Sequence, residues 1–258
     1  MKAALFHGPH QPLTIEEVQI DRPAKREVLV RTAASGVCHS DLHFVEGLWV
    51  FPPPAVLGHE AAGVVEEVGE DVTYVKPGDH VIACLSVFCG HCDDCLTGHP
   101  NRCSNPETRR GPDEPPRLSQ DGKPVNQFLN VSSYAEKMLL HENAIVKIRD
   151  DVPLDTVALI GCGVLTRVGA ALNTARVEPG STVAVFGAGG VGLPAIQGAR
   201  IAAARRSKIY RQSTAYGASL STPERRRTMS LGPIRRSNKP TDPTTSANAR
   251  LRTWLPTA

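Results

Sequence analysis

The chain has 258 residues, of which 41% are hydrophobic and 5% aromatic, enough to bury one or two cores. It contains no run of about 18 apolar residues, which excludes a membrane-spanning protein. Residues 1–204 carry 17 Lys and Arg against 24 Asp and Glu, whereas residues 205–258 carry 12 against 2, so the net charge of +3 conceals two unlike parts. Residues 1–6 are too short an apolar stretch for a secretory signal, and unpaired cysteines fit a reducing compartment, so we expect a cytoplasmic protein.

Residues 1 to about 150 contain short β-branched runs separated by proline and glycine, a pattern typical of strands and turns. The predicted strands lie within residues 27–33, 63–69, 79–84 and 144–148. Many short strands with such turns indicate a β-barrel-like domain. Residues 104–127 are polar and contain several prolines, and we predict a surface loop there.

The most specific motif is a C-x2-C-x2-C-x7-C cluster formed by Cys89, Cys92, Cys95 and Cys103. Four thiolates so close in sequence can close a tetrahedron around one zinc ion and leave no position open for chemistry. Two disulfides are the alternative, but a C-x2-C loop is a tight one to close with a disulfide bond. The cluster therefore predicts a structural zinc site, which by itself indicates no catalysis.

From residue 154 to residue 175 the sequence becomes helical and alanine-rich. Residues 181–186 then predict a buried strand, and residues 193–204 predict an apolar helix. Between them lies a G-x-G-x-x-G pattern, which allows a tight turn and lets a pyrophosphate approach the N-terminus of the helix. A glycine-rich turn without a ligand is the alternative. The three glycines are Gly187, Gly189 and Gly192.

Residues of the types that bind catalytic zinc are scattered through the first 162 positions. Such a zinc needs three protein ligands and one open position, and Cys38, His59 and Cys162 supply a Cys2His set that would polarise an alcohol oxygen. Taken alone, a single histidine before a strand is more often structural, and a cysteine between glycines is more often a packed thiol. Their occurrence together with the four-cysteine cluster favours a catalytic centre.

Two further residues near Cys38 suggest proton transfer. Ser40 and His43 are three positions apart, so the hydroxyl could take an alcohol proton and the imidazole could pass it to solvent. Ser40 could instead be a helix cap or a turn residue. Asp41 could hydrogen-bond a histidine ligand from outside the metal shell.

Together these motifs resemble the zinc-dependent medium-chain alcohol dehydrogenases over residues 1–210. The resemblance rests on Gly-His-Glu-x-x-Gly-x5-Gly at 58–69, the Cys-x-Ser-Asp-x-His segment from Cys38, the four-cysteine cluster and Gly-Cys-Gly around Cys162. It implies an α+β and α/β fold in which a GroES-like β-barrel catalytic domain precedes an incomplete Rossmann domain. The implied domains are a zinc-binding catalytic domain at 1–160, the start of an NAD(P)-binding Rossmann domain at 161–210 and a disordered basic tail at 211–258.

The family oxidises alcohols with NAD(P)+ to aldehydes or ketones, so the resemblance implies an enzyme of small-molecule alcohols, with NAD as the usual cofactor. It implies two zinc ions per chain, the catalytic one with Glu60 beside its ligands. It also implies a Ser40–His43 relay and His39 near the cofactor pyrophosphate. Trp49 and Leu85 would line the substrate pocket and suggest a primary or aromatic alcohol. Relatives form homodimers or homotetramers, and neither a membrane nor a nucleic acid is an expected partner.

The sequence also departs from the family. Arg167 replaces a glycine near the expected nicotinamide position, and Arg211 stands where an acidic residue should bind the adenosine ribose. An arginine there could favour the 2′-phosphate of NADP. However, everything after it also stops resembling the family and looks like out-of-frame translation. We therefore expect weak dinucleotide binding and little activity from this polypeptide.

Two alternatives remain open at this stage. One is a non-enzymatic zinc protein whose basic tail binds polyanions such as nucleic acid. The other is a thiol-adduct formaldehyde dehydrogenase, which shares every motif described above.

Overall fold

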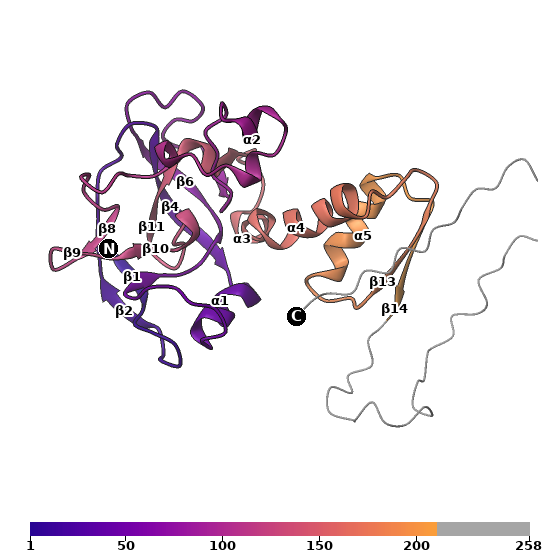
Figure 1. Cartoon of the computed structure of the whole chain (residues 1–258), viewed down its shortest axis with the longest axis horizontal. Coiled ribbons are helices and arrows are strands. Elements are labelled where there is room, and N and C mark those ends of the chain that lie inside the picture. The colour runs from indigo at the N-terminus through magenta and orange to yellow at the C-terminus, as the bar shows by residue number, and fades with distance from the viewer. Residues whose placement is uncertain (211–258) are drawn as a thin grey trace, which may run out of the picture. The chain divides into compact units, whose positions relative to one another are not determined.

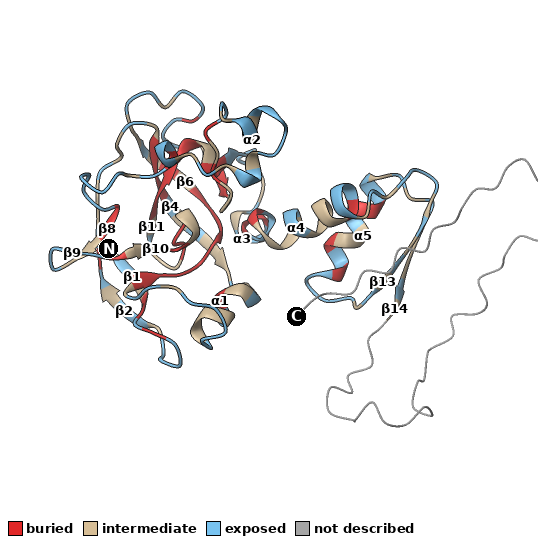
Figure 2. Ribbon diagram, viewed as in Figure 1, coloured by how far each residue is buried: buried red, intermediate tan, exposed pale blue. Residues whose placement is uncertain are grey.

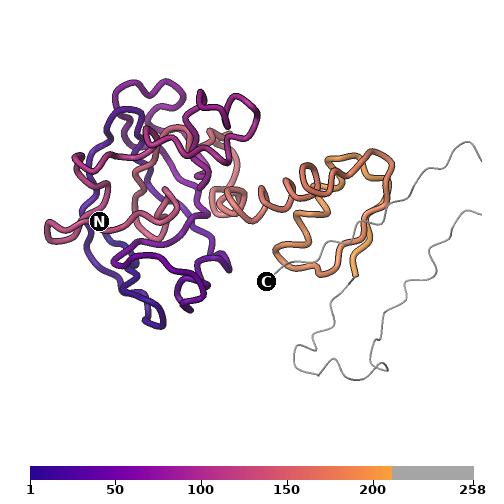
Figure 3. Tube along the Cα trace, in the orientation of Figure 1, coloured from indigo at the N-terminus to yellow at the C-terminus, as the bar shows by residue number. Residues whose placement is uncertain are grey.

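The computed structural model describes residues 1–210, which form two compact units, Met1–Leu165 and a second that begins at Thr166. Figures 1 and 3 trace the chain through both units, and each is described here by itself. The predictions of a disordered tail at 211–258 and of Arg211 at the ribose position lie outside the described residues.

The centre of the first unit is a five-stranded antiparallel sheet in the order β11-β4-β6-β7-β12. Its strands are β11 (Lys137–His141), β4 (Glu27–Gly36), β6 (Glu60–Val68), β7 (His80–Ala83) and β12 (Ile145–Lys147). β4 is the longest strand, and its Val28–Val30 run is buried on both faces. Figure 2 shows this buried centre in red on β4, β6 and β11. The four strands predicted in this region are confirmed.

Two smaller sheets complete the strands of the first unit. One has the order β10-β5-β1-β2 and the other the order β3-β8-β9. The strands are β1 (Lys2–Phe6), β2 (Thr14–Glu17), β3 (Gln19–Ile20), β5 (Ala55–Val56), β8 (Leu118–Gln120), β9 (Lys123–Pro124) and β10 (Asn126–Gln127). The helices of this unit are short. They are α1 (His39–Val45), α2 (Asp93–Leu96), α3 (Leu154–Val157) and the 3-10 turns η1 (Pro100–Arg102), η2 (Pro106–Thr108), η3 (Phe128–Asn130), η4 (Glu142–Ala144) and η5 (Ala158–Gly161).

Two glycines of the 58–69 motif are explained by the packing of β6 against its neighbours. A Cβ atom at Gly63 would overlap the backbone carbonyl of Arg31 on β4, and one at Gly69 would overlap the carbonyl of Ala24. Only glycine permits such close approach of two backbones. These glycines therefore secure the register of the central sheet, on which the position of His59 depends.

The predicted surface loop at 104–127 is wrong for its second half, which contains β8, β9 and β10 and buries Leu118 and Val125. The reason is a buried carboxylate, Glu27, at the start of β4. Arg117 donates through Nε to Glu27 Oε1 at 2.6 Å, and Arg110 donates through Nη2 to Oε2 at 2.6 Å. Arg110 also pairs with Asp21. This cluster of charges attaches the segment to the central sheet, and composition alone does not reveal it.

The second unit contains β13 (Thr182–Phe186), α5 (Gly192–Ile201) and β14 (Arg206–Tyr210), and β13 pairs with β14 in parallel. The predicted strand and helix are confirmed, but the strand is not buried: burial alternates along β13, and Phe186 is 72% exposed. Among the described residues β14 is the only strand paired with β13, so the other edge of β13 is unpaired, and the face that carries Phe186 is open.

The predicted helical stretch at 154–175 consists of several short pieces. After α3 and η5 come α4 (Gly163–Gly169) and η6 (Ala170–Thr174), a π-helical turn, and Cys162 breaks the run with φ −137° and ψ −64°. In residues 1–210, no single helix is long and apolar enough to cross a membrane. One bent pair, Leu154–Gly161 and Gly163–Thr174, passes that test jointly on length and composition.

The Glu27 cluster predicts a loss of stability when its carboxylate is neutralised. Glu27→Gln removes the anion of the buried Arg117 and one of the two anions of Arg110, and we expect a loss of about 3 kcal/mol in the free energy of unfolding. Urea denaturation measures this loss. Glu17→Gln, which alters an exposed carboxylate paired with the N-terminus, is the matched control and should change little.

The same cluster predicts an acid dependence. Burial raises the pKa of Glu27, but its hydrogen bonds to Arg110 and Arg117 outweigh burial and hold the pKa below its usual range. The stabilisation is therefore full above the unfolded-state pKa of about 4.3 and is lost as the pH falls below it. Glu27→Gln should flatten the stability profile in this acid range. An unchanged profile would contradict the assignment.

Candidate metal centres

The first candidate centre is built around the start of α1. Cys38 is the N-cap residue, with extended φ and ψ of −89° and 150°. Asp41, at the third helical position, accepts the backbone N–H of Cys38 through Oδ2 at 3.1 Å, which is a capping-box arrangement. The cap holds the Cys38 side chain at the helix N-terminus, where the helix dipole favours a thiolate.

Asp41 also connects this helix to two other segments. Its Oδ1 accepts the N–H of Gly58 at 3.2 Å and lies 3.1 Å from Nδ1 of His59, while Oδ2 accepts the hydroxyl of Tyr134 at 3.1 Å. A carboxylate accepts hydrogen bonds, so His59 carries a proton on Nδ1, and Nε2 is the nitrogen that would bind a metal. Tyr134, 93 residues further along the chain, has no signal in the sequence that links it to Asp41.

Four residues from distant parts of the chain converge beside Asp41. Their donor atoms all lie within 4.8 Å of one another. Cys162 is brought there because η5 packs closely on β7: a Cβ at Gly161 would overlap the carbonyl oxygen of Ala83. All four residues belong to the first unit. They are Cys38, His59, Glu60 and Cys162.

Without a metal, the electrostatics of this cluster favour the thiolate of Cys38 but the protonated forms of His59 and Glu60. Hydrogen bonds from Cys162, His59 and Ser40 lower the pKa of Cys38 to about 3, so the thiol is ionised. Burial lowers the pKa of His59, but hydrogen bonds to Asp41 and Cys38 outweigh it and raise the pKa to about 9. Burial and the Cys38 thiolate raise the pKa of Glu60. A zinc ion would replace the proton on His59 and compensate the thiolates.

The second candidate centre is the four-cysteine lobe of residues 89–103. A tetrahedron with Zn–S bonds of about 2.3 Å has S···S edges of about 3.8 Å. The measured Sγ···Sγ distances are 3.5 Å for Cys92–Cys95, 3.8 Å for Cys92–Cys103 and 3.9 Å for Cys89–Cys95. These sulfur positions fit one zinc ion. At 3.5 Å or more these sulfurs are too far apart for an S–S bond of about 2.05 Å, and no disulfide is present within residues 1–210, which contain all seven cysteines.

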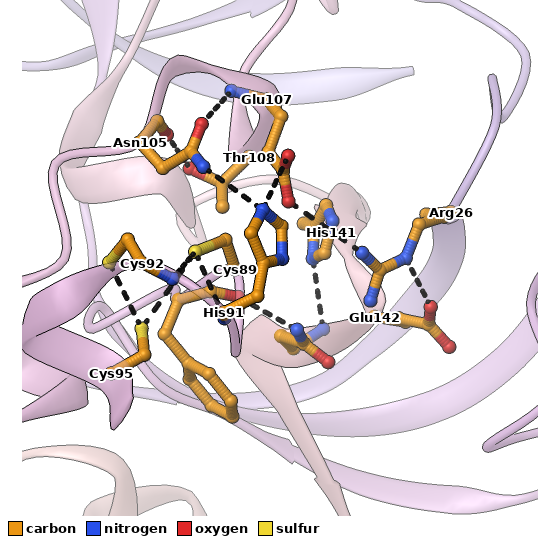
Figure 4. Close-up of polar contacts among 12 residues, drawn as sticks. Arg26, Cys89, His91, Cys92, Cys95, Asn105, Glu107, Thr108, His141 and Glu142 are labelled. Carbon is orange, nitrogen blue, oxygen red and sulfur yellow. Dashed lines mark hydrogen bonds and ion pairs between the residues drawn. The ribbon is translucent and has the colours of Figure 1, made fainter. Parts of the chain in front are cut away.

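Backbone N–H groups support the sulfur atoms of the lobe. The N–H of Cys92 donates to Sγ of Cys89 at 3.3 Å, the N–H of His91 donates to the same sulfur at 3.5 Å, and the N–H of Cys89 donates to Sγ of Cys103 at 3.3 Å. Burial raises the pKa of Cys89, but the first two of these groups outweigh it, and the pKa falls to about 6. Figure 4 shows the contacts of Cys92 and His91 with the sulfur of Cys89.

The other predicted residues of the first unit lie on or near α1. Ser40 hydrogen-bonds Cys38 through its hydroxyl and its backbone. The His43 ring lies edge-on to His39 at 4.7 Å and to Trp49 at 4.6 Å between centroids, and its buried Nδ1 has no hydrogen-bond partner in the described part of the chain. Leu85 packs instead against the core of the central sheet.

The glycine loop lies between β13 and α5, as predicted. Gly187 has φ of 97°, and its N–H bonds the carbonyl of Tyr210 at 2.8 Å. A Cβ at Gly192 would overlap the carbonyl of Gly187, whereas Gly189 has no atom within 4 Å of such a Cβ. The loop thus combines a tight turn, an open backbone position and close packing of the helix against the turn, the three features that pyrophosphate binding requires.

Comparison with known proteins identifies relatives of this chain. Residues 24–150 match the alcohol dehydrogenase GroES-like domain. Alcohol dehydrogenase class-3 of Pisum sativum is 44% identical to this chain, and the match covers 80% of this chain and 56% of the relative's length. An alcohol dehydrogenase zinc-binding domain protein from Burkholderia ambifaria is 39% identical with a TM-score of 0.73, over 81% of this chain and 58% of its own. Benzyl alcohol dehydrogenase from Acinetobacter calcoaceticus is 35% identical with a TM-score of 0.72, and the match covers 81% of this chain and 57% of that protein.

This chain therefore spans little more than half the length of these relatives. The matched part contains the GroES-like fold of the first unit and the strand, glycine loop and helix that begin a Rossmann domain. The match confirms the family that the sequence motifs predict, and with it the fold class. The chain belongs to the zinc-dependent medium-chain alcohol dehydrogenases, a family of oxidoreductases.

Proposed function

We propose that this chain provides the zinc-binding part of an oxidoreductase that interconverts alcohols and aldehydes or ketones with NAD(P). The observation that carries the proposal is the convergence of Cys38, His59 and Cys162. Within this set, Nδ1 of His59 is hydrogen-bonded to Asp41, so Nε2 is the nitrogen available to a metal. Such a set of two thiolates and one imidazole is typical of catalytic zinc, because it leaves a fourth position for substrate. The alcohol dehydrogenases among the relatives support the same reaction class.

In this proposal Cys38, Cys162 and Nε2 of His59 hold the catalytic zinc, and the four-cysteine lobe holds a structural one. Glu60 lies beside the catalytic set within 4.8 Å of its donor atoms. When bound, the zinc polarises the oxygen of the alcohol or carbonyl group. Asp41 keeps the His59 proton on Nδ1 and fixes the ring, so the ligand is held before any metal arrives.

The proton and hydride leave the alcohol by separate routes. Ser40 takes the hydroxyl proton and His43 passes it toward solvent, for which the unpartnered Nδ1 of His43 is a suitable acceptor. A bound nicotinamide cofactor would accept the hydride. The glycine loop of the second unit and the N-terminus of α5 would hold the pyrophosphate of that cofactor. Trp49 beside His43 supplies apolar surface for the substrate, consistent with an aromatic or primary alcohol.

The metal assignment predicts two zinc ions per chain with different roles. Cys92→Ala should lower the melting temperature, because the binding energy of a structural zinc is folding energy. Cys162→Ala should lower the zinc content from two to one with a smaller effect on melting. Metal analysis and thermal denaturation under reducing conditions check both variants. Equal melting losses, or no zinc in the unmodified protein, would refute the assignment.

The bonds of Asp41 predict that it controls zinc at the first centre alone. Asp41→Asn replaces one of the two carboxylate oxygens with an NH2 group, so the side chain can no longer accept all the hydrogen bonds from Cys38, His59 and Tyr134. We expect the catalytic site to bind zinc about 10-fold to 100-fold more weakly. The lobe should keep its ion. Competition with a chromophoric chelator measures both affinities. Asp71→Asn, which removes the same charge from an exposed pair with Lys25, is the control and should retain both ions.

The second unit predicts weak dinucleotide binding by this polypeptide. The glycine loop supplies contacts to the pyrophosphate, but the described nucleotide-binding unit has two strands and an open face at Phe186. Titration with NADH and NADPH, followed by nicotinamide fluorescence, measures the affinity. Micromolar binding of NADH would show that the prediction is wrong, and micromolar binding of NADPH with weak NADH binding would identify a phosphate ligand such as Arg211.

A further inference from the structure

A third group of metal-binding side chains lies at the outer edge of the four-cysteine lobe. It consists of Cys89, His91 and Glu107, whose donor atoms all lie within 4.8 Å of one another. A thiolate, an imidazole and a carboxylate are all ligands of zinc. Cys89 belongs both to this group and to the four-cysteine set, so the two groups share one sulfur (Figure 4).

Local structure holds His91 and Glu107 side by side. Gly90, with φ of 94°, turns the chain so that the His91 backbone faces the sulfur of Cys89, while its Nε2 lies 3.2 Å from Oε2 of Glu107. Glu107 lies in η2, whose cap residue Asn105 accepts the Glu107 N–H at 3.0 Å. The Asn105 side-chain amide is also 3.4 Å from Nε2 of His91. Figure 4 shows His91 between the sulfur atoms and the Glu107–Asn105 turn.

The two groups differ in their exposure to solvent. Cys89, which the two groups share, is 5% exposed, and Cys92, Cys95 and Cys103 are partly buried. The side chains of His91 and Glu107 are 61% and 40% exposed. Arg26 lies 4.0 Å from Oε1 of Glu107, but it bonds Glu142 more closely, at 2.7 Å, and leaves Oε2 to His91. The imidazole and the carboxylate are therefore more accessible than the sulfur atoms to an ion that arrives from solvent.

We propose that Cys89, His91 and Glu107 form an outer site that captures a divalent metal ion and transfers it to the four-cysteine site. During transfer the bond to Cys89 is kept. The bonds to the imidazole nitrogen and carboxylate oxygen break, and bonds to the sulfurs of Cys92, Cys95 and Cys103 form. Each of these thiols releases its proton to solvent, and no group is oxidised or reduced. The inference rests on the proposed metal site of the lobe.

The proposal has a kinetic signature. His91 and Glu107 are absent from the final set of four sulfur ligands, so their replacement leaves the equilibrium affinity for metal unchanged. Uptake and release follow the same path in opposite directions, so both rates fall by the same factor. A merely structural role for these side chains would instead weaken the affinity or lower the melting temperature.

The test uses the full chain, reduced and metal-free, mixed with Co²⁺ in a stopped-flow spectrometer. All proteins carry Cys162→Ser, so that the four-thiolate spectrum reports the lobe alone. We expect His91→Gln and Glu107→Gln to slow uptake about tenfold, which corresponds to about 1.4 kcal/mol in the barrier. Release to a chelator should slow by the same factor. His99→Gln and Asp113→Asn, which alter an exposed histidine of the lobe and an exposed carboxylate of the adjoining segment, are the controls and should match the parent.

Uptake by His91→Gln and Glu107→Gln at the rate of the controls would overturn the proposal. Slower uptake accompanied by weaker affinity would also overturn it, because the side chains would then be structural. If the parent protein gives no four-thiolate Co²⁺ spectrum, the metal assignment of the lobe fails, and the transfer fails with it. Normal spectra with unchanged rates would refute the transfer alone.

Discussion

The structure of the first unit depends on one buried carboxylate. Asp41 is 3% exposed, and a charged group so deeply buried is costly unless donors surround it. Its oxygens contact the N–H groups of Cys38 and Gly58, the ring of His59 and the hydroxyl of Tyr134. These bonds join α1, the start of β6 and the segment before β11. The same interactions that hold these segments together therefore also orient the histidine of the candidate catalytic centre.

A second buried carboxylate, at the N-terminal end of β4, also joins distant segments of the first unit. Glu27 begins this strand and binds the guanidinium groups of Arg110 and Arg117, while the residues after the other end of the strand lead to Cys38. The long insertion between β7 and β11, which includes the four-cysteine lobe, is thereby attached to the central sheet. Strand β4 thus runs from the Glu27 cluster, which holds the insertion in place, to the segment that carries Cys38 of the candidate catalytic centre.

The two metal centres differ in how they are assembled. The four cysteines lie within fifteen consecutive residues, and short turns with bonds from backbone N–H groups suffice to bring their sulfurs together. Cys38, His59 and Cys162 meet only because α1, β6 and η5 occupy fixed places around the central sheet. A local centre of the first kind can fold with its own segment, whereas the second kind requires the complete first unit.

The sequence alone determined the features that depend on short spacing. Strands appear as β-branched runs, the lobe as four cysteines at metal-ligand intervals, and the glycine loop as three glycines between a strand and a helix, since neighbouring residues set these conformations. It also identified the family, because several such motifs occur together. Only the tertiary structure showed that Tyr134 bonds Asp41, that Arg110 and Arg117 bury Glu27 within a segment that reads as a loop, and that β13 has an open face. These contacts join residues far apart in sequence or depend on which strands pair, and neighbouring residues set neither of these.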